Sequence, residues 1–563
     1  MNRRQIVSDV SGAADGPGVA DGPGVADKQR TSRLPTAAGL MFCGLILWAL
    51  LGNLLDPHYG ISRYNLGWAL AAAALVLVLM AGFYLGLRKA GPLLLRYPVL
   101  SRLGPAAGWV ALFALQIRLA YAVRLPADWD AHAVYASATG LALGTLTEID
   151  PVYFSRNPNN ILLTLLLAAY FHLVLSLGVT DLEMAAALLN AVVLFAGIAL
   201  TYAAARMLGG RTVAAFTLFP SVLLVLLSPW LGVVYSDTVG LLFPVLILCL
   251  LLAAKRSPRL LIRVPLWIAA GAAAAVGYGI KPTVLICLVA AGLTAACSPA
   301  LRGRGRGAGI LLLGALLVGG SFFAAHRMIT AYEQQTAVIG FDVGNNPAAM
   351  PPTHFLKMGA QTRPGPYGTL YGSYNEDDYA STVRVTDPEA RFQQGLDAYA
   401  ERVSAMGPGG YAAFLNHKLL WITGDGSFFT WGEGRLTGEH FVSTDPADRA
   451  VQNIFGNSRP GFPWLLSLWQ GAWFVLLALA AVPLALRTPG LVRPEVSALR
   501  IALLGLLIFL LLSEGRARFL YLYTPYFILL ASLSFQAVME RLKPARRSPR
   551  GRRKSPPEPK VVE

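Results

Sequence analysis

The chain has 563 residues, of which 55% are apolar and 14% are charged, and its mean hydropathy is +0.52. This composition excludes an ordinary soluble globular protein and indicates a polytopic membrane protein. The net charge of +16 does not indicate nucleic-acid binding, because Lys and Arg concentrate in the two tails and in short loops, as membrane topology requires. Neither a disulfide framework nor a zinc site is expected, because the cysteines lie in apolar segments without CxxC or Cys/His spacing: Cys43, Cys249, Cys287 and Cys297.

The two ends of the chain are polar. Residues 1–35 are rich in Gly, Ala and Asp and repeat the unit DGPGVA between Asp15 and Ala26. Such a segment cannot bury a core, so we predict a disordered cytoplasmic N-terminus. Residues 539–563 are basic and rich in Pro, and we predict a cytoplasmic tail that fixes the orientation of the last helix.

Apolar runs of membrane-spanning length recur along the chain and predict helices, because a helix satisfies its own backbone groups in lipid. The runs divide the chain into a membrane domain at 36–330, a polar segment at 331–461 and further membrane helices at 462–538. They lie near 36–55, 67–87, 104–123, 160–178, 184–205, 212–231, 235–254, 264–280, 282–297, 308–330, 463–486, 498–514 and 519–538.

Basic residues cluster in loops that are expected to be cytoplasmic. From a cytoplasmic N-terminus, every cluster falls inside only if the run at 160–178 is not counted as a crossing. The sequence therefore predicts an all-α polytopic protein with about twelve transmembrane helices and both ends inside. We expect Ile161–Leu177 to lie in or dip into the outer leaflet, and residues 131–146 to form a second, smaller in-plane juxtamembrane helix.

The polar segment 331–461 is acidic and too long for a connector, so we predict an exterior loop domain of mixed structure. Asp387 followed by Pro388 predicts the start of a helix that ends at Gly407. A second helix is expected from Tyr411 to Thr423. We expect residues 345–382, which are rich in Gly, Pro and Tyr, to be irregular.

Polar side chains gather in the turns that this topology places outside. Ionisable groups beside a membrane domain are costly unless they face water or a polar cavity, so they mark candidate chemistry. Structural alternatives stay open for each of them: a lysine or arginine can extend to lipid headgroups, and an acid can cap a helix or pair with an arginine four residues on. The candidates are Asp128, Asp130, Asn159, Asn160, Asp237, Lys281, Arg327, Glu514, Arg516 and Arg518.

Several of these residues lie in segments that resemble the GT-C class of integral-membrane glycosyltransferases. The resemblance is to the branch that is similar to protein mannosyltransferases and uses polyprenyl-phosphate sugars. It covers about residues 104–538, with NPNN in place of the commoner His-Pro-Pro or Lys-Pro-Pro. The matching segments are DWDAHAVYASA, YFSRNPNN, YSDTVGLLFP, GIKPT, PPTHFLKMG, YGSYNEDDY and EGRARFLYLYTP.

The resemblance implies a multi-pass plasma-membrane enzyme with its active site on the extracytoplasmic face. It would transfer a sugar, such as the hexose mannose, from a polyprenyl-phosphate donor to a hydroxyl of a glycan, lipid or protein, with inversion. The first exterior loop, 124–160, would be catalytic. The alternatives are a lipid-linked polymer ligase, or a transporter or lipid flippase, although the sequence has no internal repeat of the kind transporters show.

The resemblance also implies roles for the candidate residues. Asp130 would be the general base, with Asp128 as the second choice. The resemblance implies no particular cofactor, and a divalent metal ion is left open. The donor phosphate would bind Lys281, Arg516 and Arg518, and more weakly Arg327, while the supporting or substrate-contacting residues would be Asp237, Glu514, Asn159 and Asn160.

Overall fold

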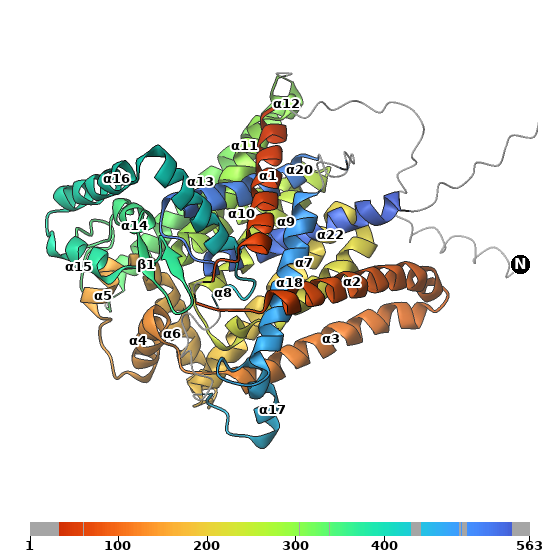
Figure 1. Cartoon of the computed structure of the whole chain (residues 1–563), viewed down its shortest axis with the longest axis horizontal. Helices are drawn as coiled ribbons and strands as arrows, with labels where there is room; N and C mark the ends of the chain where they lie inside the picture. Colours follow the sequence, from red (N-terminus) through yellow and green to blue (C-terminus); the bar gives the residue numbers. More distant parts are fainter. Residues whose placement is uncertain are drawn as a thin grey trace, which may run out of the picture.

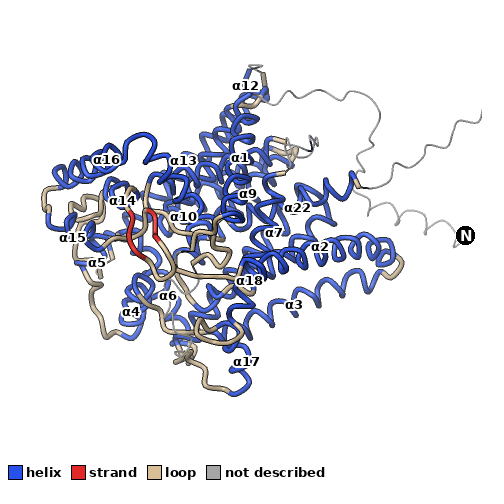
Figure 2. Tube along the Cα trace, viewed as in Figure 1, coloured by secondary structure: helices blue, strands red, loops and turns tan. Residues whose placement is uncertain are grey.

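The computed structural model describes residues 33–542, apart from gaps at 60, 303–304, 337, 430–440, 483–485 and 487–492. The predicted N-terminal segment 1–35 and tail 539–563 therefore lie almost wholly outside the described residues. Within the described part, the regular secondary structure is helical except for one antiparallel pair of short strands, β1 (Thr362–Pro364) and β2 (Thr369–Tyr371) (Figure 2). The predicted all-α class is confirmed.

The helices of the N-terminal membrane region follow the predicted apolar runs closely. Figure 1 shows α2 and α3 side by side, and α4 to α6 gathered at the opposite side of the molecule. The helices are α1 (Arg33–Leu55), α2 (Leu66–Leu95), α3 (Pro98–Val123), α4 (Trp129–Leu143), α5 (Pro151–Arg156), η1 (Pro158–Asn160), α6 (Ile161–Ser176), α7 (Leu182–Ser221), η2 (Val222–Leu226), η3 (Pro229–Gly232), α8 (Ser236–Gly240), α9 (Leu242–Arg256), α10 (Leu260–Ile280), η4 (Pro282–Val284), α11 (Leu285–Ala296), α12 (Pro299–Arg302) and α13 (Arg306–Gln335).

Residues 336–461, which we call the insert, separate these helices from the C-terminal ones. The insert contains α14 (Pro352–Gly359), the two strands, α15 (Glu376–Arg384), α16 (Pro388–Thr423) and α17 (Pro446–Phe455). The membrane region resumes with α18 (Phe462–Ala481), α20 (Pro494–Leu512), α21 (Arg518–Tyr521) and α22 (Thr524–Arg541).

Ten helices of the described residues are long and apolar enough to cross a membrane, which makes the chain a multi-pass membrane protein. The sequence predicted about twelve transmembrane helices. That number differs from ten because it included α11 and α22, counted the two halves of α7 as two helices and omitted α6. By length and composition α6 qualifies, since Pro158–Ser176 is 19 residues long with a hydropathy of 1.6. That α6 stays on one side of the membrane remains a prediction.

The long helix α7 is two helices joined at a kink. Gly210 has φ 82° and ψ −172°, a conformation that is accessible to glycine and costly for other residues. The kink lies between the two apolar runs of the sequence, 184–205 and 212–231, where Arg206 and Arg211 interrupt the apolar residues. The two halves therefore correspond to the two predicted spans.

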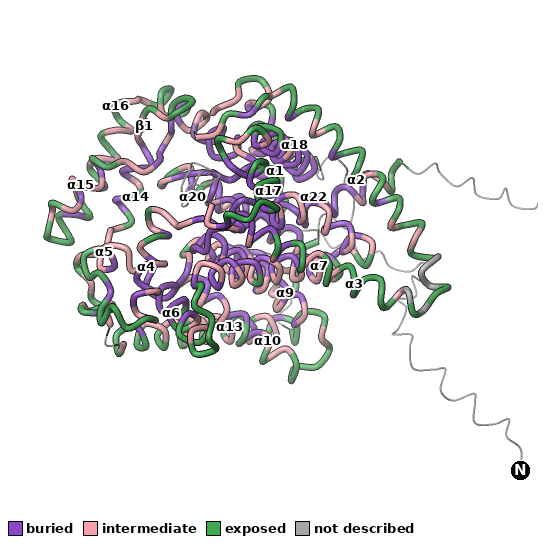
Figure 3. Tube along the Cα trace, turned by 90° about the horizontal axis from the view of Figure 1, so that it is seen from below, coloured by how far each residue is buried: buried purple, intermediate pink, exposed green. Residues whose placement is uncertain are grey.

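The core of the bundle is built around α18 and α22. Buried residues concentrate in the middle of the bundle, whereas α2 and α3 expose much of their surface (Figure 3). Trp469 and Trp473 of α18 are at most 2% exposed, and residues 524–535 of α22 are all buried. The turn between α20 and α22, which carries Glu514, Arg516 and Arg518, is thus attached to a well-buried part of the bundle.

In the insert, α16 begins and ends where the sequence predicts. Asp387 caps it by accepting a hydrogen bond from the backbone N of Ala390 at 2.8 Å, and the helix ends before Gly424. Gly407 interrupts it with φ 63° and ψ 172°. The two predicted helices are therefore the two halves of one kinked helix.

The expectation that residues 345–382 are irregular is wrong in part. This range contains α14, the strand pair and most of α15. Local signals for both helices are present in the sequence: Pro352 stands at the first position of α14, and the Asn375 side chain caps α15 by accepting from the backbone N of Asp378 at 2.9 Å. The abundance of Gly, Pro and Tyr obscured these signals.

Candidate functional site

The two acids at the start of α4 occupy different environments. Asp128 is the N-cap, with extended backbone, and its carboxylate accepts from the backbone N of Trp129 at 3.1 Å. Asp130 lies in the first helical turn, where the helix dipole stabilises a negative charge. The carboxylate of Asp130 accepts a hydrogen bond from Tyr153, which belongs to another element, α5.

The segment YFSRNPNN folds into two short helices that bring polar groups to Asp130. The Tyr153 hydroxyl donates to Oδ1 of Asp130 at 2.7 Å, and Nδ2 of Asn160 donates to the Tyr153 oxygen at 2.7 Å. Nδ2 of the exposed Asn159 donates to Oδ1 of Asn160 at 3.2 Å. Pro158 starts η1 and so fixes the turn that carries both asparagines.

A second group forms around Asp237, which is fully buried in the first turn of α8. Its Oδ1 lies 3.0 Å from Nζ of Lys281, and its Oδ2 lies 4.0 Å from Nε of Arg518. Lys281 also donates to Oγ of Ser236 at 3.3 Å. We call Asp237, Lys281 and Arg518 the cation cluster. Two cations and one acid give the cluster one net positive charge. This charge is largely buried, because the side chains of Lys281 and Arg518 are 12% and 7% exposed.

Tyr235 connects the cation cluster with Asp130. Its hydroxyl lies 3.5 Å from Oδ1 of Asn160, which in turn reaches Asp130 through Tyr153. The Tyr235 ring lies 5.8 Å from Nζ of Lys281 and 5.9 Å from Cζ of Arg518. We call Asp130, Tyr153, Asn160 and Tyr235 the polar chain.

Burial sets the protonation of the two tyrosines. Burial, followed by the nearby charge of Asp130, raises the pKa of Tyr153 well above its ordinary value. The same two causes raise the pKa of Tyr235. Both hydroxyls therefore remain hydrogen-bond donors at neutral pH. Burial lowers the pKa of the Lys281 ammonium, and the Asp237 carboxylate opposes that shift.

Glu514 and Arg516 pair with each other beside the cluster. Oε1 of Glu514 lies 3.0 Å from Nη2 of Arg516, so Arg516 is the partner of Glu514 in place of the residue four positions on. The Arg516 guanidinium lies over the rings of Phe429, at 5.4 Å, and Tyr374, at 6.0 Å, which both belong to the insert. The insert thus contributes directly to the surroundings of the candidate site.

Arg327 is the candidate that the structure leaves apart. Within the described part of the chain it lies exposed on α13 and takes no part in the cation cluster or the polar chain. The other charged candidates come from four turns that are distant in sequence: the start of α4, the start of α8, the end of α10 and the turn after α20.

The candidate site does not fit a divalent metal ion. Among the described residues, no three His, Cys, Asp or Glu side chains form a group that could hold one. Both carboxylate oxygens of Asp237 face the cations Lys281 and Arg518, which would repel a metal ion.

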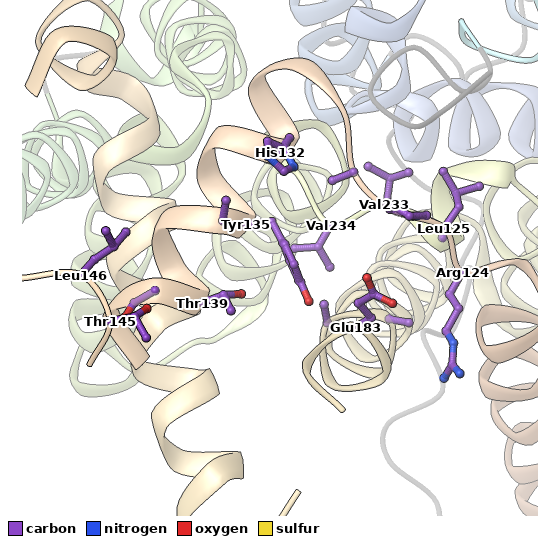
Figure 4. A pocket seen from close by; sticks show the side chains of 17 residues that line it. Arg124, Leu125, His132, Tyr135, Thr139, Thr145, Leu146, Glu183, Val233 and Val234 are labelled. Carbon is purple, nitrogen blue, oxygen red and sulfur yellow. The ribbon is translucent and has the colours of Figure 1, made fainter. Parts of the chain in front are cut away.

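A cavity of about 420 Å³ lies beside α4 (Figure 4). Residues 132, 135 and 139 of α4 line it, and at 100° per residue these positions point away from position 130. Tyr135 and Glu183 extend into it from α4 and α7. This cavity is separate from the polar chain.

Sequence reasoning did not assign Tyr153 and Tyr235. Both lie inside segments that were singled out for other residues, YFSRNPNN and YSDTVGLLFP. Their role depends on contacts between α4, η1 and the segment before α8, which the sequence does not show. The only local signal was that Tyr153 shares a segment with Asn160, and Tyr235 shares one with Asp237.

No curated protein compared with this chain matches it. Among solved structures, an oligosaccharyltransferase from Archaeoglobus fulgidus, tethered to an acceptor peptide with an NVT sequon, is similar with a TM-score of 0.40 and 13% sequence identity. The similarity covers 77% of this chain and 50% of that one, so the chain spans about half the length of that enzyme. The model of the family described as conserved hypothetical integral membrane protein matches residues 68–539, and the chain belongs to this family.

Proposed function

We propose that the chain is a membrane glycosyltransferase of the GT-C type. It transfers a sugar, a hexose such as mannose, from a polyprenyl-phosphate donor in the bilayer to an acceptor hydroxyl on the extracytoplasmic face. The observation that carries the proposal is the series of hydrogen bonds from Asp130 through Tyr153 and Asn160 to Tyr235. The ring of Tyr235 lies 5.8 Å from Nζ of Lys281 in the buried cation cluster. A base and a phosphate-binding group at one place are what such a transfer needs.

The cation cluster suits the donor phosphate. Lys281 and Arg518 share one acid, Asp237, so the group retains positive charge for an anionic ligand. Arg516, paired with Glu514, is the third proposed contact. Charge-assisted hydrogen bonds to phosphate are strong because both partners are charged and partly shielded from water. The prenyl chain would lie among the helices, with its phosphate at their ends.

Asp130 suits the acceptor side of the reaction. In one displacement, the acceptor oxygen forms a bond to the anomeric carbon of the sugar while the bond from that carbon to the phosphate oxygen breaks. The polyprenyl phosphate leaves with the electron pair, and the acceptor proton passes to Asp130. Tyr153 orients the carboxylate through Oδ1, and the acceptor proton would pass to Oδ2. Asp128 contributes to the start of α4 as its N-cap.

The test uses the purified full chain, a labelled polyprenyl-phosphate hexose and cell-envelope glycans and lipids as acceptors. Asp130→Asn keeps shape but removes the charge, so it should bind the donor as the wild type does and turn over about 10²–10⁴-fold more slowly. Asp128→Asn is the matched control and should retain most of the activity.

Donor binding is measured separately. Lys281→Ala and Arg518→Ala should each weaken binding of the donor about ten- to hundredfold, because each removes a hydrogen bond between charged groups. Near-normal turnover of Asp130→Asn would exclude it as the base. A wild-type chain that neither binds nor transfers the polyprenyl-phosphate hexose would refute the proposed function.

A further inference from the structure

Lys418, in the second half of α16, joins the insert to the end of α20. Its side chain is fully buried, and its Nζ donates to three backbone oxygens: Gly359 at 2.7 Å, Leu511 at 2.9 Å and Ser513 at 2.6 Å. A protonated lysine has three N–H donors, and all three are used. Leu511 is among the last residues of α20, whose carbonyls have no partner within the helix and favour a cation.

The backbone just after α20 is attached to the insert at two more points. The backbone N of Glu514 donates to O of Phe355 at 2.9 Å, and that of Gly515 donates to O of Gly372 at 2.8 Å. Gly372 has φ +62°, and a Cβ there would lie 2.5 Å from Nζ of Lys418, so this close approach requires glycine. The insert therefore fixes the segment that leads into the two arginines of the candidate site.

We propose that Lys418 is a positioning residue for the donor phosphate. Its ammonium fixes the backbone of residues 513–518 and so places Arg516 and Arg518. Lys418 does not bind the phosphate itself, because its three N–H groups are engaged. This inference rests on the proposed function and extends it: the insert, through Lys418, determines the affinity for the polyprenyl-phosphate donor.

The chain offers a matched control for Lys418→Met. Lys357 is also buried in the insert, and its Nζ donates to O of Asp378 at 3.0 Å, Oγ of Ser381 at 3.0 Å and Oγ1 of Thr382 at 2.7 Å. These partners all belong to the insert. Lys357→Met thus removes a buried ammonium with three hydrogen bonds while leaving the contacts of residues 513–518 in place.

Two measurements on the full chain in detergent or nanodiscs test the inference. One is hydrogen exchange at the amides of Glu514 and Gly515, which reports the position of the segment without any substrate. The other is the dissociation constant of a polyprenyl phosphate, together with the KM values for donor and acceptor. In Lys418→Met we expect exchange at both amides and the donor dissociation constant to rise about tenfold or more, with the acceptor KM unchanged. Lys357→Met should change none of these.

Several results would overturn the inference. One is wild-type protection of the Glu514 and Gly515 amides in Lys418→Met. Another is lost amide protection with wild-type affinity for the donor. A third is an equal effect of Lys418→Met and Lys357→Met. If Lys418→Met does not yield folded chain, Lys418→Gln, which keeps two N–H donors, is measured at the same amides and judged by the same outcomes. Failure of the wild-type chain to bind polyprenyl phosphate refutes the proposed function itself and is seen before any substitution is made.

Discussion

At the scale of single residues, Tyr153 joins Asp130 to Asn160. Its hydroxyl contacts Asp130 on one side and Asn160 on the other, at 2.7 Å each. The ring is largely buried, so the hydroxyl cannot be replaced easily by water. The orientation of the proposed base therefore depends on a residue that does not itself take part in proton transfer.

Tyr153→Phe removes this hydrogen bond and leaves the ring. We expect turnover to fall about tenfold, because one hydrogen bond to a charged group is lost, while donor affinity stays at the wild-type value. Turnover and donor binding of the purified variant are the measurements. Tyr170→Phe is the control: its hydroxyl donates to O of Ala185 at 3.0 Å, away from Asp130. An equal fall in both variants would contradict a specific role for Tyr153.

A second residue, His354, makes the stability of the insert depend on pH. His354 is buried, with Nδ1 2.9 Å from Oγ1 of Thr382, and burial followed by the charge of Lys357 lowers its pKa to about 4. In the unfolded chain a histidine titrates near 6.5. Between pH 6.5 and 4 the unfolded chain therefore binds a proton that the folded insert does not bind, and the free energy of unfolding falls as the pH falls.

The expected slope is up to about 1.4 kcal/mol for each pH unit within that window. Hydrogen exchange of the insert, measured from pH 7 to pH 4, checks it. In His354→Gln this contribution should disappear, so the variant and wild-type curves should converge as the pH falls and differ by a constant above pH 6.5. Parallel curves through the whole range would show that His354 is not the group responsible.

At the scale of elements, α16 shows how one glycine shapes the insert. Gly407 adopts φ 63° and ψ 172°, a region that other residues enter at a cost of about 1–3 kcal/mol. The kink redirects the second half of α16, which carries Lys418, toward the end of α20. A Cβ at Gly407 would meet nothing within 4 Å, so the cost of a larger residue lies in the backbone alone.

Gly407→Ala should therefore lower the free energy of unfolding by about 1–3 kcal/mol, measured as a reduced melting temperature of the purified chain. Gly409→Ala is the matched control, since Gly409 also has open space around its Cβ position but lies in the helix with negative φ. There the alanine should be neutral or stabilising by about 0.5–1 kcal/mol. Equal melting temperatures of the two variants would contradict the assignment.

At the scale of the whole molecule, the insert packs against the segment 124–160. The backbone N of Ile149 donates to O of Val338 at 3.0 Å, and that of Met350 donates to O of Arg156 at 3.2 Å. The two segments therefore lie on the same side of the helical bundle, as the charge distribution predicts. That this side is the exterior remains a prediction.

Cysteine labelling tests the exterior assignment. Thiols introduced as Val152→Cys in α5 and Glu401→Cys in α16, both at exposed positions, should react with a membrane-impermeant reagent applied from outside. Ser257→Cys, in the basic turn after α9, should react only after the membrane is opened. The native cysteines are a small background because three of the four are buried. Labelling of Ser257→Cys from outside would reverse the topology.

The sequence by itself determined the membrane class, the positions of the helices and the ends of several of them. Hydrophobic length and local capping decide these features: Asp387 and Pro388 start a helix whatever surrounds it, and Gly407 interrupts it. The sequence also identified the turns that carry charge, and with them Asp130 and Lys281, because charged residues stand out against apolar runs.

Only the tertiary structure decided which of these groups meet. Asp237 pairs with Lys281 and Arg518 rather than serving as a simple helix cap, Glu514 pairs with Arg516, and Arg327 lies apart. Such choices depend on how helices distant in sequence pack, since a buried charge takes whichever partner the packing brings within a few ångströms. The contacts of Lys418 with the end of α20 join positions 93 and 95 residues apart, which local pattern cannot reveal.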